Sequence, residues 1–316
     1  MFVKKNIDKV YYLFLISHLI LWTLIPSLTN INLPLDTIEA LAWGSNLDWG
    51  FNKHPPFSAF AVEAFYRIFG NQDWAYYLLS QIFVIITFIV VFKFAKEFFK
   101  NINYALLSLL LLEGIFFYNF TTPEFNVNIS QLPFWALCIY YTWRCLKGDK
   151  AKDFIFLGIF MGLGFLSKYL FIYLILSIKF LFIYLIINKK LKSYNFLLTA
   201  PVAFLIISPH LIWLVDNNFI TINYGLKRTG EIDSFINHFT FPIIFILKQV
   251  GILLPFLFMS YFLLKKLKFK KIKLDDKMIF LLFVSFLPIF LIFLTSFFMG
   301  AKIRTMWMTP FYLFFG

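Results

Sequence analysis

The sequence predicts an all-α bundle of membrane-spanning helices. Of its 316 residues, 61% are hydrophobic and 14% are charged, whereas a soluble domain has roughly 45–50% and about 25%. Runs of about 20 apolar residues recur along the chain, and each is long enough to cross a hydrocarbon core of roughly 30 Å. Only helices and closed β-barrels satisfy all backbone hydrogen bonds within a bilayer. These runs lack the alternation of apolar and polar residues that barrel strands show, so they are predicted to be helices.

A single transmembrane domain covering residues 1–316 is expected, with nine complete spans and an incomplete tenth. The last twelve residues, 305–316, are too short to span a bilayer, so we expect a shortened chain with a truncated C-terminus. The predicted spans are residues 10–29, 72–92, 103–120, 129–146, 154–167, 169–187, 196–215, 239–264 and 278–299, with the incomplete one beginning at 305.

The net charge of +13 indicates membrane topology rather than nucleic-acid binding. When the spans alternate, 20 of the 29 Lys and Arg residues fall on one side of the membrane and seven on the other. Because basic residues concentrate on the cytoplasmic side, this bias predicts an inside N-terminus. Membrane lipids are therefore the expected surroundings, and no nucleic-acid partner is predicted.

Two long loops, 30–71 and 216–238, lie on the outer side in this topology. The first contains two helical stretches, 36–47 and 56–69. The second stretch is predicted to lie in the membrane interface, because apolar side chains occupy one of its faces. That face holds Phe57, Phe60, Ala61, Ala64 and Phe65.

Asp36 and Glu39 in the first outer loop are candidate site residues. Their spacing of three places them on one face of a helix, about one turn apart. An interfacial carboxylate could act as general base toward a hydroxyl. The alternative is a capping box, with Asp36 as the N-cap and Glu39 at the third helical position. Both readings stay open, since a cap also holds the carboxylate in place.

Basic residues in the outer loops are candidates for binding a phosphate. Lys53 and His54 precede Pro55 and Pro56, which stiffen the turn and could present both side chains to a lipid phosphate. Lys168 sits where a short span turns back, and Arg228 lies beside Lys227 in the second outer loop. Each has a plainer reading: an interfacial anchor, a snorkelling lysine, or a solvated loop pair.

Acidic residues complete the set of candidates. Glu124, in Thr122-Pro123-Glu124, is the single charge of its loop and is expected on the same side as Asp36. Glu113 falls within a predicted span, so we expect it to face the bundle rather than lipid. The four histidines show no metal-ligand spacing, and no phosphate-binding glycine loop or nucleophile elbow is present. No metal ligand is therefore predicted.

These motifs together resemble the polytopic lipid-linked sugar transferases of glycosyltransferase family 39. That group includes protein O-mannosyltransferases, and the aminoarabinose transferases acting on lipid A look similar. The resemblance covers residues 30–215 and rests on the order and shared sidedness of five elements. They are Asp36, Trp49-Gly50-Phe51, His54-Pro55-Pro56, Thr122-Pro123-Glu124, and the glycine-rich stretch 158–169 that ends in Ser167-Lys168-Tyr169.

The resemblance implies a GT-C fold with a site on the outer face of a bacterial cytoplasmic (inner) membrane. A polyprenyl-phosphate-linked sugar would be the donor, and a lipid, glycan or protein the acceptor. Asp36 would act on the acceptor hydroxyl, with Glu124 as a second acid near the sugar. Glu39, Lys53, His54, Lys168 and Arg228 would bind the substrate or its phosphate. No cofactor is implied with certainty, and a divalent metal stays open.

One departure concerns the first loop, where the family often has Asp-Glu. Here Asp36 is followed by Thr37, and Glu39 comes two residues later. Two other classes of protein remain as alternatives. A lipid or solute transporter or flippase predicts polar residues along a path through mid-membrane and often related halves. A noncatalytic scaffold predicts no transfer activity that depends on the outer acids.

Overall fold

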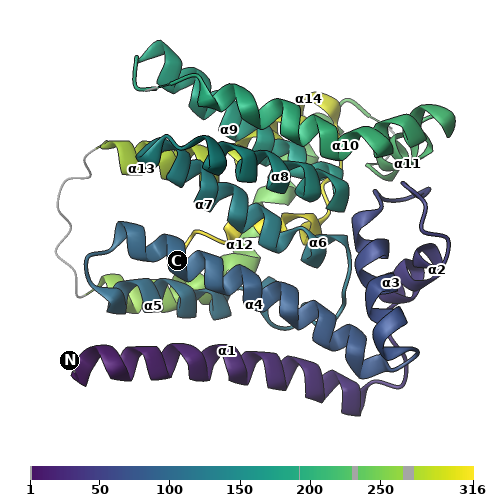
Figure 1. The fold of residues 1–316 in the computed structure, drawn as a ribbon, viewed down its shortest axis with the longest axis horizontal. Coiled ribbons are helices and arrows are strands. Elements are labelled where there is room, and N and C mark those ends of the chain that lie inside the picture. Colours follow the sequence, from purple (N-terminus) through teal and green to yellow (C-terminus); the bar gives the residue numbers. More distant parts are fainter. Residues whose placement is uncertain (1, 192, 230–233, 266–273) are drawn as a thin grey trace.

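The computed structural model describes residues 2–191, 193–229, 234–265 and 274–316, and in these ranges it is helical without strands (Figure 1). The α-helices are α1 Phe2–Thr29, α2 Leu35–Gly44, α3 Phe57–Phe69, α4 Asp73–Phe98, α5 Ile102–Leu110, α6 Val127–Ser130, α7 Leu132–Gly148, α8 Ala151–Ser167, α9 Ile172–Ile187, α10 Thr199–Asp216, α11 Ile220–Arg228, α12 Asn237–Leu264, α13 Asp276–Leu281 and α14 Leu287–Met299.

Six helical segments among the described residues are long and apolar enough to cross a membrane. Two further predicted spans, α7 and α8, have 17 residues each, or about 26 Å at 1.5 Å per residue. The predicted boundary at residue 168 is present, because α8 ends at Ser167 and α9 follows a short 3-10 turn. The six long segments are Asn6–Thr29, Asp73–Phe98, Tyr169–Ile187, Asn195–Asp216, Asn237–Leu264 and Asp276–Met299.

The third predicted span, 103–120, is not one continuous helix. It consists of α5 followed by two 3-10 turns, Leu111–Gly114 and Phe116–Tyr118. The break occurs where the chain meets α12, since a Cβ on Gly114 would lie 2.7 Å from the Cα of Phe256. Hydrophobicity alone predicted the span, and it carries no information about this close approach.

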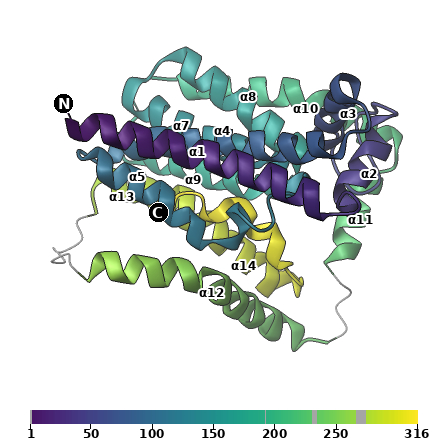
Figure 2. The ribbon, with the colours of Figure 1, turned by 90° about the horizontal axis from the view of Figure 1, so that it is seen from below.

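The long helices run side by side, and α2, α3 and α11 gather at the end of the bundle opposite the N-terminus (Figure 1). Seen from below, α12 lies along one flank beside α14 (Figure 2). The helix α3 crosses the direction of α1 and α4 (Figure 1). The predicted helical stretch 56–69 therefore lies at one end of the long helices (Figure 1).

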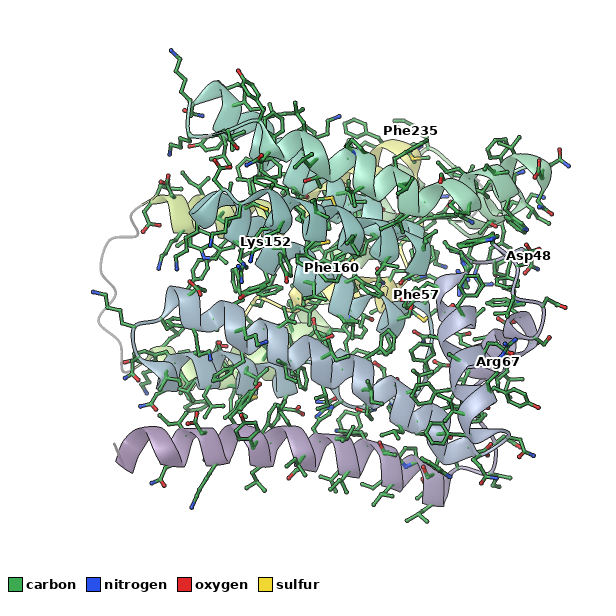
Figure 3. All side chains as sticks on the ribbon, in the orientation of Figure 1. Asp48, Phe57, Arg67, Lys152, Phe160 and Phe235 are labelled. Carbon is green, nitrogen blue, oxygen red and sulfur yellow. The ribbon has the colours of Figure 1, made fainter. Side chains whose placement is uncertain are left out.

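The face of α3 that packs against the protein lies beside the apolar face predicted for the membrane interface. Its buried residues include Val62 and Glu63, and the Glu63 carboxylate accepts a hydrogen bond from Arg67 Nε at 2.8 Å. Phe57 packs edge-on against Phe83 and Phe134 of the bundle. Asp48, Phe57 and Arg67 mark this end of the molecule (Figure 3). The predicted apolar face, with Phe60, Ala61, Ala64 and Phe65 half-buried or exposed, stays a candidate for the membrane interface.

Two other segments have a secondary structure that the sequence did not predict. The second outer loop contains the helix α11, and the predicted incomplete span is a 3-10 helix, Thr305–Tyr312. Residues 308–312 of this 3-10 helix are buried within the protein, whereas Met306 is exposed. Tyr118 Oη donates to the carbonyl of Thr309 at 2.8 Å, and Tyr312 Oη to Gln249 Oε1 at 2.7 Å.

Candidate active site

A cavity of about 480 Å³ opens where α2 and α11 meet the bundle. Its lining includes six of the seven site residues predicted from the sequence. Apolar side chains from α9, α11, α14 and the segment leading into the C-terminal 3-10 helix also line it. The six predicted residues lining the cavity are Asp36, Glu39, Lys53, His54, Lys168 and Arg228.

The helix α2 presents Asp36 and Glu39 to the cavity. It begins at Leu35 with Pro34 in the N-cap position, and no side chain caps it. The predicted capping box is therefore wrong, because Asp36 already lies inside the first helical turn. A preceding proline fixes the start of this helix in place of a side-chain acceptor. The Asp36 carboxylate is thus free of a capping bond.

Glu124 lies behind Asp36 rather than in the cavity wall. Its Oε1 accepts a hydrogen bond from the backbone N–H of Asp36 at 3.3 Å, and its Oε2 accepts one from Asn126 Nδ2 at 3.3 Å. Burial raises the pKa of Asp36, and the neighbouring Glu39 raises it further. Burial and then Asp36 likewise raise the pKa of Glu124. The two acids are held together despite their mutual repulsion.

The Trp49-Gly50-Phe51 motif has a steric explanation. A Cβ on Gly50 would lie 2.3 Å from the indole ring of Trp213 in α10, so only glycine fits there. Phe51 then turns back, and its N–H donates to the carbonyl of His54 at 3.1 Å. The ring of Phe51 stacks on Trp43 of α2. The motif thereby fixes the turn that carries Lys53 and His54.

His210 of α10 secures the same turn, although its sequence context gave no signal for this. Its Nδ1 lies 2.6 Å from the carbonyl oxygen of Trp49, and its Nε2 lies 2.7 Å from Tyr169 Oη. Because a carbonyl oxygen can only accept, Nδ1 carries the proton and Nε2 accepts from the tyrosine. His210 therefore connects the first outer loop to the start of the α9 span.

Lys53 and His54 differ in charge. The Lys53 ammonium forms an ion pair with Glu39, and this hydrogen bond raises the pKa of Lys53. Burial lowers the pKa of His54 to about 3, with Lys168, Lys53 and Arg228 adding to the effect. His54 is therefore neutral at pH 7 and can offer a hydrogen bond, but no charge, to a ligand.

Lys168 is the most deeply placed cation of the cavity, with 4% of its surface exposed. Its ammonium donates a hydrogen bond to Asn128 Oδ1 and lies 5.6 Å from the ring centre of Trp307. Burial lowers the pKa of Lys168 to about 7, while Asp36 acts in the opposite direction. The snorkelling alternative is wrong, because the side chain points into the protein instead of reaching an interface.

Arg228 enters the cavity from the last turn of α11, 5.7 Å from the ring centre of Tyr224. The helix is anchored to the first outer loop by Thr221, whose hydroxyl donates to the carbonyl of Phe51 at 2.5 Å. Lys227, the other half of the predicted pair, is exposed and does not line the cavity. The two outer loops thus close on each other around one site.

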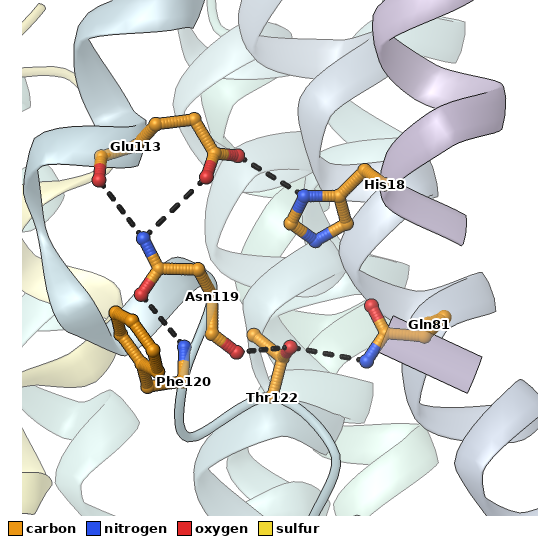
Figure 4. Close-up of polar contacts among 6 residues, drawn as sticks. All are labelled: His18, Gln81, Glu113, Asn119, Phe120 and Thr122. Atoms are coloured by element: carbon orange, nitrogen blue, oxygen red, sulfur yellow. Dashed lines mark hydrogen bonds and ion pairs between the residues drawn. The ribbon is translucent and has the colours of Figure 1, made fainter. Parts of the chain in front are cut away.

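Glu113 belongs to a different cluster within the bundle (Figure 4). Its Oε1 lies 3.0 Å from His18 Nδ1, and Asn119 Nδ2 donates to its carbonyl oxygen at 2.8 Å. The expectation that Glu113 faces the bundle is confirmed. From Asn119 the hydrogen bonds continue through its carbonyl oxygen to Thr122, whose hydroxyl accepts from Gln81 at 3.0 Å. This cluster braces the loop that leads to Glu124.

No group of three or more His, Cys, Asp or Glu residues within the described ranges is arranged to hold a metal ion. Of the two acids that line the cavity, Glu39 is paired with Lys53. The cavity therefore joins two acids, one neutral imidazole, three basic side chains and several apolar side chains. Such an arrangement suits an amphiphile with an anionic head and a reacting hydroxyl or acetal beside it.

Comparison with known proteins finds glycosyltransferases that are similar to this chain. Residues 53–213 match the family model described as dolichyl-phosphate-mannose-protein mannosyltransferase. Over 238 residues the chain is 25% identical to the lipopolysaccharide core galacturonosyltransferase RgtB of Rhizobium johnstonii, covering 73% of this chain and 47% of the relative. RgtA of the same organism is 21% identical over 188 residues, covering 59% and 38%. The chain thus spans less than half of each relative's length.

The fold has a solved counterpart. The crystal structure of ArnT from Cupriavidus metallidurans bound to undecaprenyl phosphate superposes with a TM-score of 0.69. It covers 96% of this chain and 58% of the ArnT chain, with 16% sequence identity. The expected GT-C membrane fold is therefore confirmed, and the chain is a multi-pass membrane protein.

Proposed function

The chain belongs to the dolichyl-phosphate-mannose-protein mannosyltransferase family, and from this premise we propose that it transfers a sugar from a polyprenyl-phosphate donor to an acceptor hydroxyl. The observation that carries the proposal is the cavity itself. Its lining brings Asp36 and Glu39 together with Lys168 and Arg228, and it includes apolar side chains that suit a lipid. Undecaprenyl phosphate bound to ArnT supports the class of donor.

In the proposed reaction the acceptor oxygen attacks the anomeric carbon from the side opposite the phosphate. The carbon–oxygen bond to the phosphate breaks, and polyprenyl phosphate leaves with the electron pair. The acceptor proton passes to the Asp36 carboxylate, so the configuration at the anomeric carbon inverts. Because burial and Glu39 raise the pKa of Asp36, its carboxylate is a stronger base than a solvated one.

The leaving phosphate gains negative charge as the bond breaks, and this charge needs donors that are already in place. We assign this role to Lys168 and Arg228, with the neutral His54 supplying a hydrogen bond. Lys53 is paired with Glu39, so we assign it the role of fixing the Glu39 carboxylate rather than of binding the phosphate alone. Glu124 orients Asp36 by accepting its backbone N–H.

We further propose that the protein lies in a bacterial inner membrane, with its N-terminus inside and the cavity on the outer face. The bias of Lys and Arg toward one side supports this topology. The acceptor is a lipid, a glycan or a protein, and the RgtB and RgtA relatives, described as acting on lipopolysaccharide core, favour a glycan of the cell envelope.

The test is a transfer assay with labelled polyprenyl-phosphate sugars and membrane extract. Wild type should transfer the label, and Asp36→Asn should leave the lipid-linked sugar untransferred. Asp48→Asn is the matched control, because Asp48 is exposed in the same loop and accepts only the N–H of Trp49. Equal transfer by wild type and Asp36→Asn would exclude Asp36 as the base. Adding EDTA to the same assay decides the need for a divalent metal.

A transporter or flippase predicts a different result from the same materials. It would move the lipid across a vesicle membrane without breaking the bond between sugar and phosphate. Loss of label transfer together with unchanged lipid movement in Asp36→Asn identifies a transferase. Lipid movement without any transfer by wild type would favour the transporter.

A further inference from the structure

Two buried asparagines follow Glu124 and connect the two chemical halves of the cavity. Asn126 is 8% exposed and Asn128 is 5% exposed. One contacts the acid pair and the other contacts the deepest cation. Neither was predicted from the sequence as a site residue. Burying a carboxamide is costly unless its polar atoms are hydrogen-bonded, so the partners of these two residues carry information.

Asn126 uses the two ends of its amide for two different purposes. Its Oδ1 caps the short helix α6, accepting from the N–H groups of Asn128 at 2.8 Å and Ile129 at 3.2 Å. Its Nδ2 donates to Glu124 Oε2 at 3.3 Å, on the carboxylate whose other oxygen accepts from Asp36. An N-cap needs only an acceptor, which Asp or Ser would also supply. Asparagine differs from aspartate and serine here in its amide N–H group, which donates to Glu124.

Asn128 lines the cavity and accepts a hydrogen bond from the Lys168 ammonium through Oδ1. A carboxylate at this place would also accept that bond, but it would neutralise the charge of Lys168. The amide fixes the direction of the ammonium and leaves its charge for an anion in the cavity. The helix α6 thus carries Asn128, which orients the Lys168 ammonium, and the position of this helix depends on the cap supplied by Asn126.

We propose that Asn126 and Asn128 are positioning residues of this site, and that their neutral amides place Glu124 and Lys168 while leaving both charges intact. The inference rests on the proposed transferase function. It assigns the Asn126-Val127-Asn128 turn as the physical link between the acid half and the cation half. A shift of this turn would displace Glu124 and Lys168 together.

Asn126→Asp tests the first half. The substitution keeps the cap of α6 but removes the donor to Glu124, and it sets a second carboxylate beside that residue. Because the two capped backbone N–H groups favour the ionised form of the introduced carboxylate, the proton goes to Glu124. We expect kcat to fall about tenfold at neutral pH and the acid limb of its pH profile to move to higher pH. A purely structural defect would lower kcat at every pH without moving the profile.

Asn128→Asp tests the second half. The introduced carboxylate pairs with Lys168, so binding of undecaprenyl phosphate should weaken about tenfold, and KM for the donor should rise more than kcat falls. Undecaprenyl phosphate binding is measured by displacement of a fluorescent analogue from purified protein. Unchanged affinity and an unchanged pH profile in both variants would overturn the proposal.

A matched control exists at the far end of the bundle. Asn101 caps α5 by accepting the N–H of Asn103 at 3.0 Å, so Asn101→Asp repeats the chemistry of the cap away from the cavity. It should leave both binding and kcat unchanged. If either Asp variant fails to fold, Asn126→Ser removes the amide donor to Glu124 and Asn128→Ala removes the acceptor for Lys168, both without adding a charge. In these variants the kcat loss and the weakened phosphate binding, respectively, should persist.

Failure of the inference is separable from failure of the proposed function. If wild type neither binds undecaprenyl phosphate nor transfers sugar, the proposed function fails. If wild type does both and the two Asp variants match it, the transferase stands and the positioning role is wrong.

Discussion

The backbone N–H of Asp36 donates to the Glu124 carboxylate at 3.3 Å, although the two residues are 88 positions apart in the chain. Asp36 stands in the first turn of α2, and Glu124 in a loop that the intramembrane cluster of Asn119 and Thr122 braces. The position of each acid therefore depends on a contact with a distant segment. Substitutions at this pair consequently test both the chemistry and the geometry of the site.

Asp36→Asn and Glu124→Gln should separate the two acids. Loss of a general base costs roughly 10²–10⁴-fold in rate, so Asp36→Asn should lower kcat by at least 10²-fold. Glutamine at position 124 still accepts the N–H of Asp36, and its kcat should fall by only about tenfold. Donor affinity should change little in both variants. Equal losses of kcat would mean that Glu124 acts on the substrate directly.

Donor affinity should depend on the protonation of Lys168. Its folded-state pKa of about 7 lies well below its usual value, so the free protein loses this charge as pH rises above neutral. An anionic phosphate binds the protonated form, and the dissociation constant should rise by up to about tenfold per pH unit above 7. Binding titrations of undecaprenyl phosphate from about pH 6 to about pH 9 measure this.

Lys168→Arg provides the control, because arginine remains charged over the whole range. Its affinity, whatever its size, should be flat with pH. A wild type whose affinity is also flat would show that Lys168 does not bind the phosphate.

Gly50→Ala should destabilise the protein because its methyl group would overlap the Trp213 ring. Overpacking of this kind costs about 1–3 kcal/mol. Thermal unfolding in detergent should show a lower midpoint, and Trp213→Ala should restore part of the loss when combined with Gly50→Ala. Gly251→Ala in α12 is the matched control, since nothing lies within 4 Å of its added methyl. It should be neutral or stabilising by about 0.5–1 kcal/mol.

The His18–Glu113 cluster should matter for stability more than for chemistry. Glu113→Leu removes the acceptor of His18 Nδ1, at a cost of about 1–3 kcal/mol for the unsatisfied group. It also removes the weaker side-chain acceptor of Asn119 Nδ2 at 3.4 Å, but that amide keeps its bond to the backbone carbonyl of residue 113. Glu113→Gln keeps an acceptor for both and should cost less. Transfer activity per folded molecule should stay near wild type in both variants. A specific loss of kcat in Glu113→Gln would instead assign the cluster a part in the reaction.

The sequence was sufficient for the fold class and for most of the cavity wall. Long apolar runs determine where helices cross a bilayer, and polar residues in outer loops mark what faces the outer side. Asp36, Lys168 and Arg228 could be selected because charge near a membrane is costly and therefore conspicuous. Their placement around one cavity agrees with the expectation, and their chemical roles stay predictions.

The features that sequence reasoning missed depend on contacts between distant segments. Thr221 bonds to Phe51 across 170 residues, and His210 to Trp49 across 161. No periodicity reports such a pairing, and asparagines such as Asn128 look like ordinary loop residues. The capping box at Asp36 failed for a local reason instead, since Pro34 takes the position that the motif assigned to the aspartate.

The wall of the cavity also has a consequence for biosynthesis. It takes residues from α2, from the start of α9, from α11 and finally from Ile303 and Trp307. A nascent chain leaving the insertion machinery consequently exposes its acids and cations in turn, but encloses no cavity until the segment at Trp307 has been delivered. On the proposed function, we expect a chain that ends before Ile303 to bind no donor lipid, because its cavity lacks this part of the lining.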